Sequence, residues 1–108
     1  MKDELVYIKQ ILDSVSKIEN FTVETTQEDF VKNQMMQSAV IMQLILIGEL
    51  AKKLKDNVQK SIDLPWKDIM GFRDRAIHDY FEMDLKMVWE TVEKDVPDLK
   101  SKLAPFLL

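Results

Sequence analysis

The segment from Gln27 to Asn57 contains no proline, and its middle, Ala39 to Ile47, is apolar almost all the way round a helix. Such a segment predicts one long helix, which at about 1.5 Å per residue would extend for about 45 Å. A compact chain of 108 residues has a radius of gyration of only about 13 Å. The helix must therefore protrude, bend near Gly48 or be covered by a second molecule. Because a helix that is apolar on every side is buried on more than one side, we predict that part of it lies in a homodimer interface.

The remaining apolar residues recur at intervals of three and four, which is the period of an amphipathic helix. Before the long segment, this pattern predicts a helix from Glu4 to Ile18. A loop over Thr22 to Thr26 follows, since its β-branched and polar residues make a poor helix interior. Thr26 is a suitable N-cap for the long helix, because two acidic residues follow it in the first turn.

After the long segment, the sequence predicts a polar connector and a further helix. The connector spans Asp56 to Asp63. The new helix begins at Pro65, since proline suits the first position of a helix. Its apolar stripe continues as far as Tyr80 or Met83, on one continuous helix.

The last helix begins near Asp84, a suitable cap. Pro97 should kink it or start a short new helix with Asp95 as its cap. A chain of 108 residues has room for one core, so we expect a single domain over residues 1–108. With short connectors, the predicted fold class is all-α: an up-and-down antiparallel bundle of four helices, with a short fifth helix at most.

The residue counts exclude several classes of site. The chain has no cysteine, which excludes disulfides, thiolate metal sites and cysteine nucleophiles, and one histidine cannot build a multi-histidine metal site. We therefore expect no metal and no cofactor. Neither a signal peptide nor an apolar stretch of about 20 residues is evident, which favours a cytoplasmic protein without a membrane partner. The net charge of −4 counts against general attraction to nucleic acid but leaves a local cationic cleft open.

The densest group of functional side chains is the segment from Arg73 to Tyr80. On a continuous helix Arg73 and Tyr80 share one face, while Asp74 and His78 share another. Arg73 and His78 are five residues apart and would point about 140° away from one another. The length of the arginine side chain, an irregularity in the helix, or a symmetric dimer with both copies at one cleft would reduce this separation.

Arginine and histidine together suit the cleavage of a phosphodiester. The guanidinium fits phosphate oxygens bidentately and stabilises the charge that builds on phosphorus. Histidine exchanges protons near neutral pH, so it can act on a ribose 2′-hydroxyl or on a leaving oxygen. Attack by the 2′-hydroxyl needs no metal and would confine the enzyme to RNA. The reaction uses one acid and one base, and because each chain has a single histidine, a dimer would supply the second.

Ordinary structural roles are open for the same residues. A lone histidine on a helix is often a surface or core residue, and Asp74 can simply pair with His78 or Arg75. Tyr80 and Phe81 are adjacent large aromatic residues of the kind that often belong to a core.

Two neighbouring groups on the long segment are also candidates for ordinary roles. Glu49 follows the apolar run directly, and because a buried glutamate needs a partner, we expect it to pair with Arg73. A basic group beyond it is typical of a solvated face near a helix end: Lys52, Lys53 and Lys55.

The segment from Arg73 to Tyr80 matches the Arg-x4-His-x-Tyr signature of HEPN-domain proteins. The chain resembles in particular the small HepT-type toxins of prokaryotic HEPN/MNT toxin–antitoxin pairs. Further residues typical of that family occur in the same order, mostly in the second half of the chain: Ile47-Gly48-Glu49, Ala51-Lys52, Pro65-Trp66, Met70-Gly71, Asp74, Phe81, Val88-Trp89, Pro97 and Leu99.

The resemblance implies a metal-independent ribonuclease toxin that is built as a helical bundle and acts as a homodimer, with its active cleft at the dimer interface. It implies that Arg73 and His78 are the catalytic pair and that Asp74 helps to hold the site. Tyr80 matches the tyrosine that, in this family, a partner nucleotidyltransferase of the MNT type can modify with AMP to silence the toxin. The added phosphate would bring negative charge and bulk to the place where the RNA phosphate must bind.

A second interpretation is a non-catalytic helical dimer that binds a nucleotide or a nucleotidyltransferase partner. The motif would then serve phosphate contact alone, and the acidic net charge and the single histidine favour this interpretation. RNA cleavage that depends on Arg73 and His78 would distinguish the enzyme from the binding module.

Overall fold

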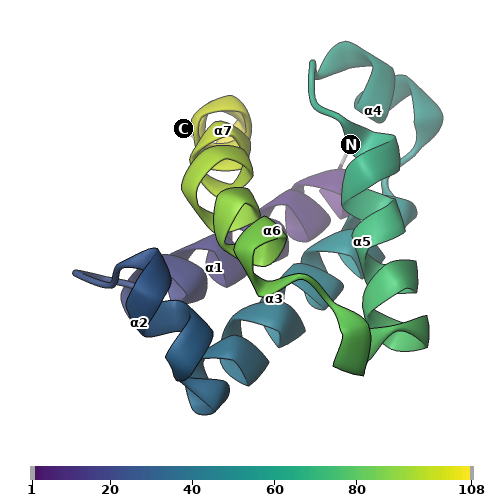
Figure 1. The fold of residues 1–108 in the computed structure, drawn as a ribbon. Coiled ribbons are helices and arrows are strands. Elements are labelled where there is room, and N and C mark those ends of the chain that lie inside the picture. The colour runs from purple at the N-terminus through teal and green to yellow at the C-terminus, as the bar shows by residue number, and fades with distance from the viewer. Residues whose placement is uncertain (1, 108) are drawn as a thin grey trace.

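The chain folds entirely into helices and turns over residues 2–107, which are the residues that the computed structural model describes (Figure 1). The predicted all-α class is therefore confirmed. In chain order the elements are α1 (Lys2–Phe21), α2 (Gln27–Lys32), α3 (Gln34–Lys53), α4 (Asp56–Ser61), α5 (Trp66–His78), η1 (Tyr80–Glu82), α6 (Leu85–Glu90), η2 (Thr91–Asp95), α7 (Val96–Leu103) and η3 (Ala104–Leu107).

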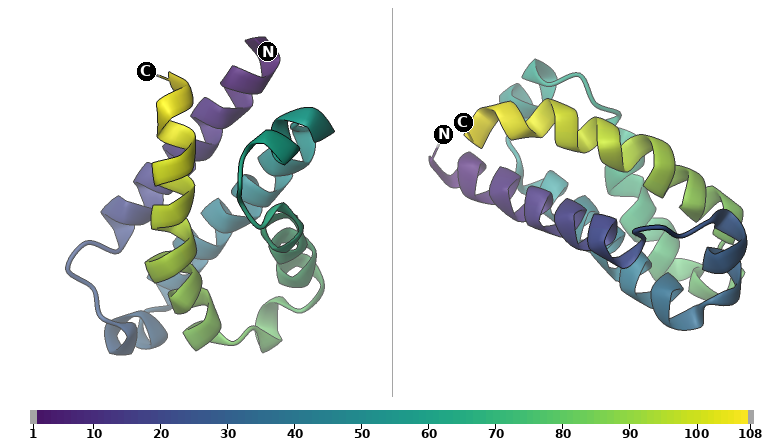
Figure 2. Two further views of the ribbon diagram at one scale, coloured as in Figure 1. Left: turned by 90° about the horizontal axis from the view of Figure 1, so that it is seen from above. Right: turned by 90° about the vertical axis from the view of Figure 1, so that its left-hand side faces the viewer.

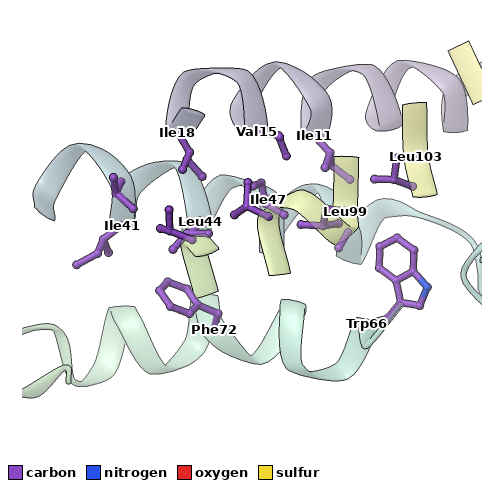
Figure 3. Packing of buried hydrophobic residues seen from close by; sticks show 14 of the residues in the cluster. Ile11, Val15, Ile18, Ile41, Leu44, Ile47, Trp66, Phe72, Leu99 and Leu103 are labelled. Atoms are coloured by element: carbon purple, nitrogen blue, oxygen red, sulfur yellow. The ribbon is translucent and has the colours of Figure 1, made fainter. Parts of the chain in front are cut away.

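Helix α3 is the central element of the bundle. It packs against α1 on one side and against α5 on the other, and α7 packs along α1 (Figures 1 and 2). The directions of α1, α3, α5 and α7 alternate, as the order of the labelled core residues shows (Figure 3). This is the predicted up-and-down arrangement, and the radius of gyration of 13.6 Å is that of a compact chain.

The core is formed by the apolar faces that the sequence pattern predicts. In α1, buried residues recur at intervals of three and four: Ile8, Ile11, Val15 and Ile18. The C-terminal helices contribute Val88, Trp89, Val92, Val96, Leu99 and Leu103. Burial of such side chains is the main favourable term in folding, at about 1.5–3 kcal/mol for each large one.

The single helix predicted from residue 27 to residue 57 is wrong in its first part, because Asn33 divides it into α2 and α3. Asn33 has an extended backbone, and its side chain accepts a hydrogen bond from the Met36 N–H at 3.0 Å. Asparagine favours such a cap over a helix interior. The break allows Phe30 to pack against Trp89, with ring centroids 5.3 Å apart. Helix α3 then continues through Gly48 without interruption.

The connector predicted over residues 56–63 is wrong as well, because it contains helix α4. Val58 and Ile62 are buried and four residues apart, which is a helical spacing. The polar residues around them made this spacing hard to recognise in the sequence. The Trp66 indole N–H donates to the carbonyls of Gln59 and Ile62, at 2.9 and 3.1 Å. Glu4, which is only 3% exposed, accepts a hydrogen bond from the Lys55 N–H at the turn between α3 and α4.

The last helix changes form before Pro97: α6 is followed by the π-helical turn η2, and α7 begins at Val96 with Pro97 in its first turn, which is the predicted short new helix. Residues Thr91–Asp95 form a π-helical turn, in which the Val96 N–H donates to the Thr91 carbonyl five residues earlier. Pro97 has no N–H, and its ring would crowd the carbonyl four residues before it, so a wider turn accommodates it. Asp95 stands at the start of α7 but makes no capping hydrogen bond with its side chain, whereas Asp84 caps α6 as predicted.

Helix α3 has the length and composition of a membrane span, with a mean hydropathy of 1.3 over 18 residues. It is the one such helix within residues 2–107, and the expectation that the chain holds no stretch of this kind was wrong. A third of that window is buried inside the bundle, where α3 contacts α1 and α5. Packing on two sides accounts for the apolar residues in the buried third of this window.

Candidate functional site

The candidate site lies where α3 and α5 approach closely, and Gly48 permits this approach. A Cβ atom at Gly48 would lie 2.9 Å from the Ile69 carbonyl oxygen and 3.0 Å from the Arg73 Cβ, both on α5. Only a residue without a side chain fits there. Gly48 therefore brings its neighbour Glu49 next to Arg73.

We expect Gly48→Ala to lower the free energy of unfolding by about 1–3 kcal/mol, because the new methyl group forces two packed backbones apart. Gly71→Ala is the matched control, since a Cβ at Gly71 meets only the Arg75 side chain, at 3.7 Å. That change should stabilise the protein by up to about 1 kcal/mol, which is the helix preference of alanine over glycine. Urea denaturation followed by circular dichroism measures both, and an unchanged or raised stability of Gly48→Ala would contradict the close approach.

Arg73 is held between two carboxylates. Its Nε lies 2.5 Å from Glu49 Oε1, and its Nη1 donates to Asp74 Oδ1 at 3.1 Å. The contact between Arg73 and Glu49 is an ion pair by its distance, but the Nε–H group of Arg73 makes no hydrogen bond with the carboxylate. The predicted pairing of Glu49 with Arg73 is thus present, although Glu49 is not buried: 42% of its side chain is exposed.

Asp74 joins the two helices through a lysine. Lys52, in the last turn of α3, donates to Asp74 Oδ1 at 3.1 Å, the same oxygen that accepts from Arg73. Hydrogen bonds from Arg73 and then from Lys52 lower the pKa of Asp74 below its ordinary value. Asp74 therefore pairs with neither His78 nor Arg75, which were its predicted alternatives. We call Glu49, Lys52, Arg73 and Asp74 the charge cluster; its formal charges sum to zero.

His78 is the last residue of α5 and is exposed. The helix stops there because Asp79 leaves the helical conformation, with φ −130° and ψ 35°. Within residues 2–107 no hydrogen bond or ion pair joins His78 to Arg73. The two residues predicted to act together thus lie on one helix without a polar interaction between them, as a spacing of five residues implies.

Tyr80 does not lie on the same helix as Arg73, which corrects the prediction of one continuous helix to residue 80 or beyond. It belongs to the short turn η1, and its hydroxyl lies 3.2 Å from Ser38 Oγ on α3. Tyr80 is 39% exposed and Phe81 is 98% exposed, so neither is a core residue. A hollow of about 420 Å³ lies beside Tyr80, between α3 and η1.

Large apolar side chains are exposed around the charge cluster. Met42 and Leu46 lie on the face of α3 that ends at Glu49, at 52% and 39% exposure. Ile77 lies one turn beyond Arg73 on α5, at 51% exposure. We call these three residues the apolar rim. The chain itself leaves them partly uncovered.

Two contacts of this site were not predicted from the sequence. Lys52 was expected to face solvent with Lys53, and Ser38 was not considered. The spacing of Lys52 three residues after Glu49 places both on one face of α3 and is the signal that could have found it. No group of three or more side chains able to hold a metal ion occurs within residues 2–107.

Comparison with known proteins identifies the family. The profile of a family described as “Ribonuclease HepT-like” matches residues 11–105. The chain is 37% identical to a “Probable ribonuclease HepT” of Thermococcus cleftensis over 97 residues, which cover 89% of this chain and 88% of that protein. It is 34% identical to a “Putative RNase” of Caldanaerobacter subterraneus subsp. tengcongensis over 108 residues, 99% of this chain and 96% of that one.

A longer relative contains a region similar to this chain. It is the “Gamma-glutamylcyclotransferase and putative RNase” of Methanocaldococcus jannaschii, 38% identical over 103 residues. These residues are 94% of this chain but only 46% of that protein. No solved structure matches the chain. From the family profile and the relatives that match over most of their length, the chain belongs to the HepT-like ribonuclease family.

Proposed function

We propose that this protein is the toxin of a prokaryotic toxin–antitoxin pair and acts as a metal-independent endoribonuclease. Arg73 and His78 are its catalytic residues, and Glu49 and Asp74 hold Arg73. One observation carries the proposal: the arginine head is held at the surface by two carboxylates, on the same helix as an exposed histidine.

The reaction that fits these groups is attack of a ribose 2′-hydroxyl on the neighbouring phosphorus. The bond from O2′ to phosphorus forms and the bond from phosphorus to O5′ breaks, which leaves a 2′,3′-cyclic phosphate and a 5′-hydroxyl. A histidine takes the proton from the 2′-hydroxyl or gives one to O5′. Arg73 stabilises the negative charge that grows on the phosphate oxygens.

A homodimer completes the site in this proposal. The apolar rim (Met42, Leu46 and Ile77) lies on the two helices that carry the charge cluster, and exposed apolar groups of this kind mark contact surfaces. A twofold axis near the rim would bring two copies of α5 to one cleft, because such an interface uses the same patch on both chains. This cleft would then have two histidines, one from each chain, with one acting as base and the other as acid.

Tyr80 is the proposed point of control. Tyr80 is 39% exposed and lies two residues from His78, and we propose that an MNT-type nucleotidyltransferase antitoxin attaches AMP to its hydroxyl. The attached phosphate is negatively charged and would repel the RNA phosphate. It would also replace the contact of the Tyr80 hydroxyl with Ser38 and so change how η1 rests on α3.

The test of this proposal is cleavage of RNA by the purified wild-type protein in the presence of EDTA. We expect fragments with 2′,3′-cyclic phosphate and 5′-hydroxyl ends, detected by mass spectrometry of a defined oligonucleotide. The same oligonucleotide with 2′-O-methyl groups should remain intact, because it has no attacking hydroxyl. Mass spectrometry of the protein must show that Tyr80 is unmodified.

The alternative is the non-catalytic dimer that binds a nucleotide or a nucleotidyltransferase. No hydrogen bond or ion pair joins Arg73 to His78 within the described residues, which favours it. Unmodified protein that leaves RNA intact in EDTA and in magnesium alike would support this alternative and contradict the nuclease.

A further inference from the structure

Lys52 and Lys53 occupy the same turn of α3 but contact different helices. The ammonium of Lys52 is 3.1 Å from Asp74 Oδ1 on α5. The ammonium of Lys53 lies 5.6 Å above the ring of Tyr7 on α1. Of these two lysines at the end of α3, only Lys52 belongs to the charge cluster.

Asp74 brings the ammonium of Lys52 together with the guanidinium of Arg73. Both donate to Asp74 Oδ1 at 3.1 Å, so their nitrogens lie within twice that distance of each other. The lysine comes from α3 and the arginine from α5, and both side chains are about one-third exposed. Two cationic donors that converge on one oxygen anion from different helices can also bind two oxygens of one phosphate.

Asp74 has the same charge as a phosphodiester of RNA, the group that would replace it between the two cations. The carboxylate is half-exposed, and the two cations favour its ionised form. A phosphodiester carries one negative charge, as the carboxylate does, and both match the donors of arginine and lysine. When the two cations turn from the carboxylate to a phosphate, each of them therefore still faces one negatively charged oxygen group.

We propose that Lys52 is a phosphate-binding residue of the RNA site, next to Arg73, and that Asp74 is a positioning residue that holds both cations when no RNA is bound. This inference rests on the proposed function in taking RNA as the substrate. It adds a residue from α3 to the two proposed catalytic residues, Arg73 and His78, which both lie on α5.

The competing explanation is that Lys52 only stabilises the fold. A surface ion pair contributes little, and a cation in the last turn of a helix interacts favourably with the helix dipole. Lys53 shares that position in the helix and lies on another side of it. The variants Lys52→Met and Lys53→Met therefore remove one charge each from the same turn and form a matched pair.

The experiment measures binding of a 2′-O-methyl RNA 20-mer, which cannot be cleaved through a 2′-hydroxyl, by fluorescence anisotropy over a series of salt concentrations. Lys52→Met should raise Kd about 10-fold, the usual effect of losing a hydrogen bond to a charged group. It should also reduce the slope of log K against log salt by about 0.7, the value for one phosphate contact on a single strand. Lys53→Met should change neither Kd nor the salt slope by a comparable amount. Lys52→Arg should retain most of the affinity of the wild-type protein.

Each outcome separates this inference from the nuclease proposal. Equal effects of Lys52→Met and Lys53→Met, or no binding by the wild-type protein at low salt, would overturn the inference. If binding depends on Lys52 but natural RNA is not cleaved, the inference stands and the nuclease proposal fails. If RNA is cleaved and the two lysine variants bind alike, the nuclease proposal stands and the inference fails. Circular dichroism of both variants checks that the fold is intact.

Discussion

Arg73→Ala is expected to lower kcat/KM for RNA by about 10²–10³-fold, the usual loss when one charge-stabilising donor is removed from a reacting centre. The guanidinium is the group that Glu49 and Asp74 hold in place, and no other side chain of the charge cluster offers a bidentate fork. The change also leaves Glu49 without its cation beside the ionised Asp74. The measurement is the rate of cleavage of a fluorescent RNA oligonucleotide under single-turnover conditions.

Arg75→Ala is the matched control for this prediction. Arg75 lies two residues further along α5, is more exposed than Arg73, and lines the hollow of about 240 Å³ between α5 and α6. Both variants lose the same charge from the same helix, so a general electrostatic effect on RNA binding would affect them equally. A rate that falls to the same extent in both variants would contradict a specific role of Arg73.

His78→Ala is expected to lower kcat by about 10²–10⁴-fold, the range for loss of a general acid or base. Because His78 is exposed at the end of α5, the free energy of unfolding should change by less than about 0.5 kcal/mol. Expression of the wild-type chain alone should stop bacterial growth, and expression of His78→Ala should not. Cleavage by His78→Ala at the wild-type rate would exclude the proposed mechanism.

Mixtures of wild-type and His78→Ala chains show whether the two histidines of a dimer serve one cleft. If the cleft uses them as base and acid, a mixed dimer has only one of them and is inactive, so an equal, randomly assembled mixture keeps about a quarter of the activity of an all-wild-type sample. If each chain has a complete site of its own, the activity falls in proportion to the wild-type fraction, to about a half. A value of about a half would contradict a shared cleft.

The elements whose side chains follow a simple period were predictable from the sequence. The buried ridge of α1 and the apolar series from Val88 to Leu103 follow the three–four spacing, and burial confirms both. The caps Thr26 and Asp84 were predictable because short polar side chains satisfy free N–H groups at a helix start. The break at Asn33 was not, since the advantage of the cap depends on Phe30 reaching Trp89.

The candidate site was predictable in its residue types but not in its contacts. The motif identified Arg73, Asp74, His78 and Tyr80, and the position of Glu49 suggested its partner. The end of α5 at His78 was missed, because the apolar stripe continues past it to Met83. The site therefore divides between a helix and a turn, where the sequence suggested one helical face.

What the sequence by itself determined is the helical class, the order and direction of the main helices, and the segment that carries the charged motif. These follow from periodicity and from residue chemistry, which act within a few turns of the chain. Only the tertiary structure decided that Gly48 lets α3 approach α5, and that Glu49 and Lys52 thereby meet Arg73 and Asp74. Contacts between residues more than 20 positions apart depend on how closely two helices pack, and local sequence patterns do not specify that distance.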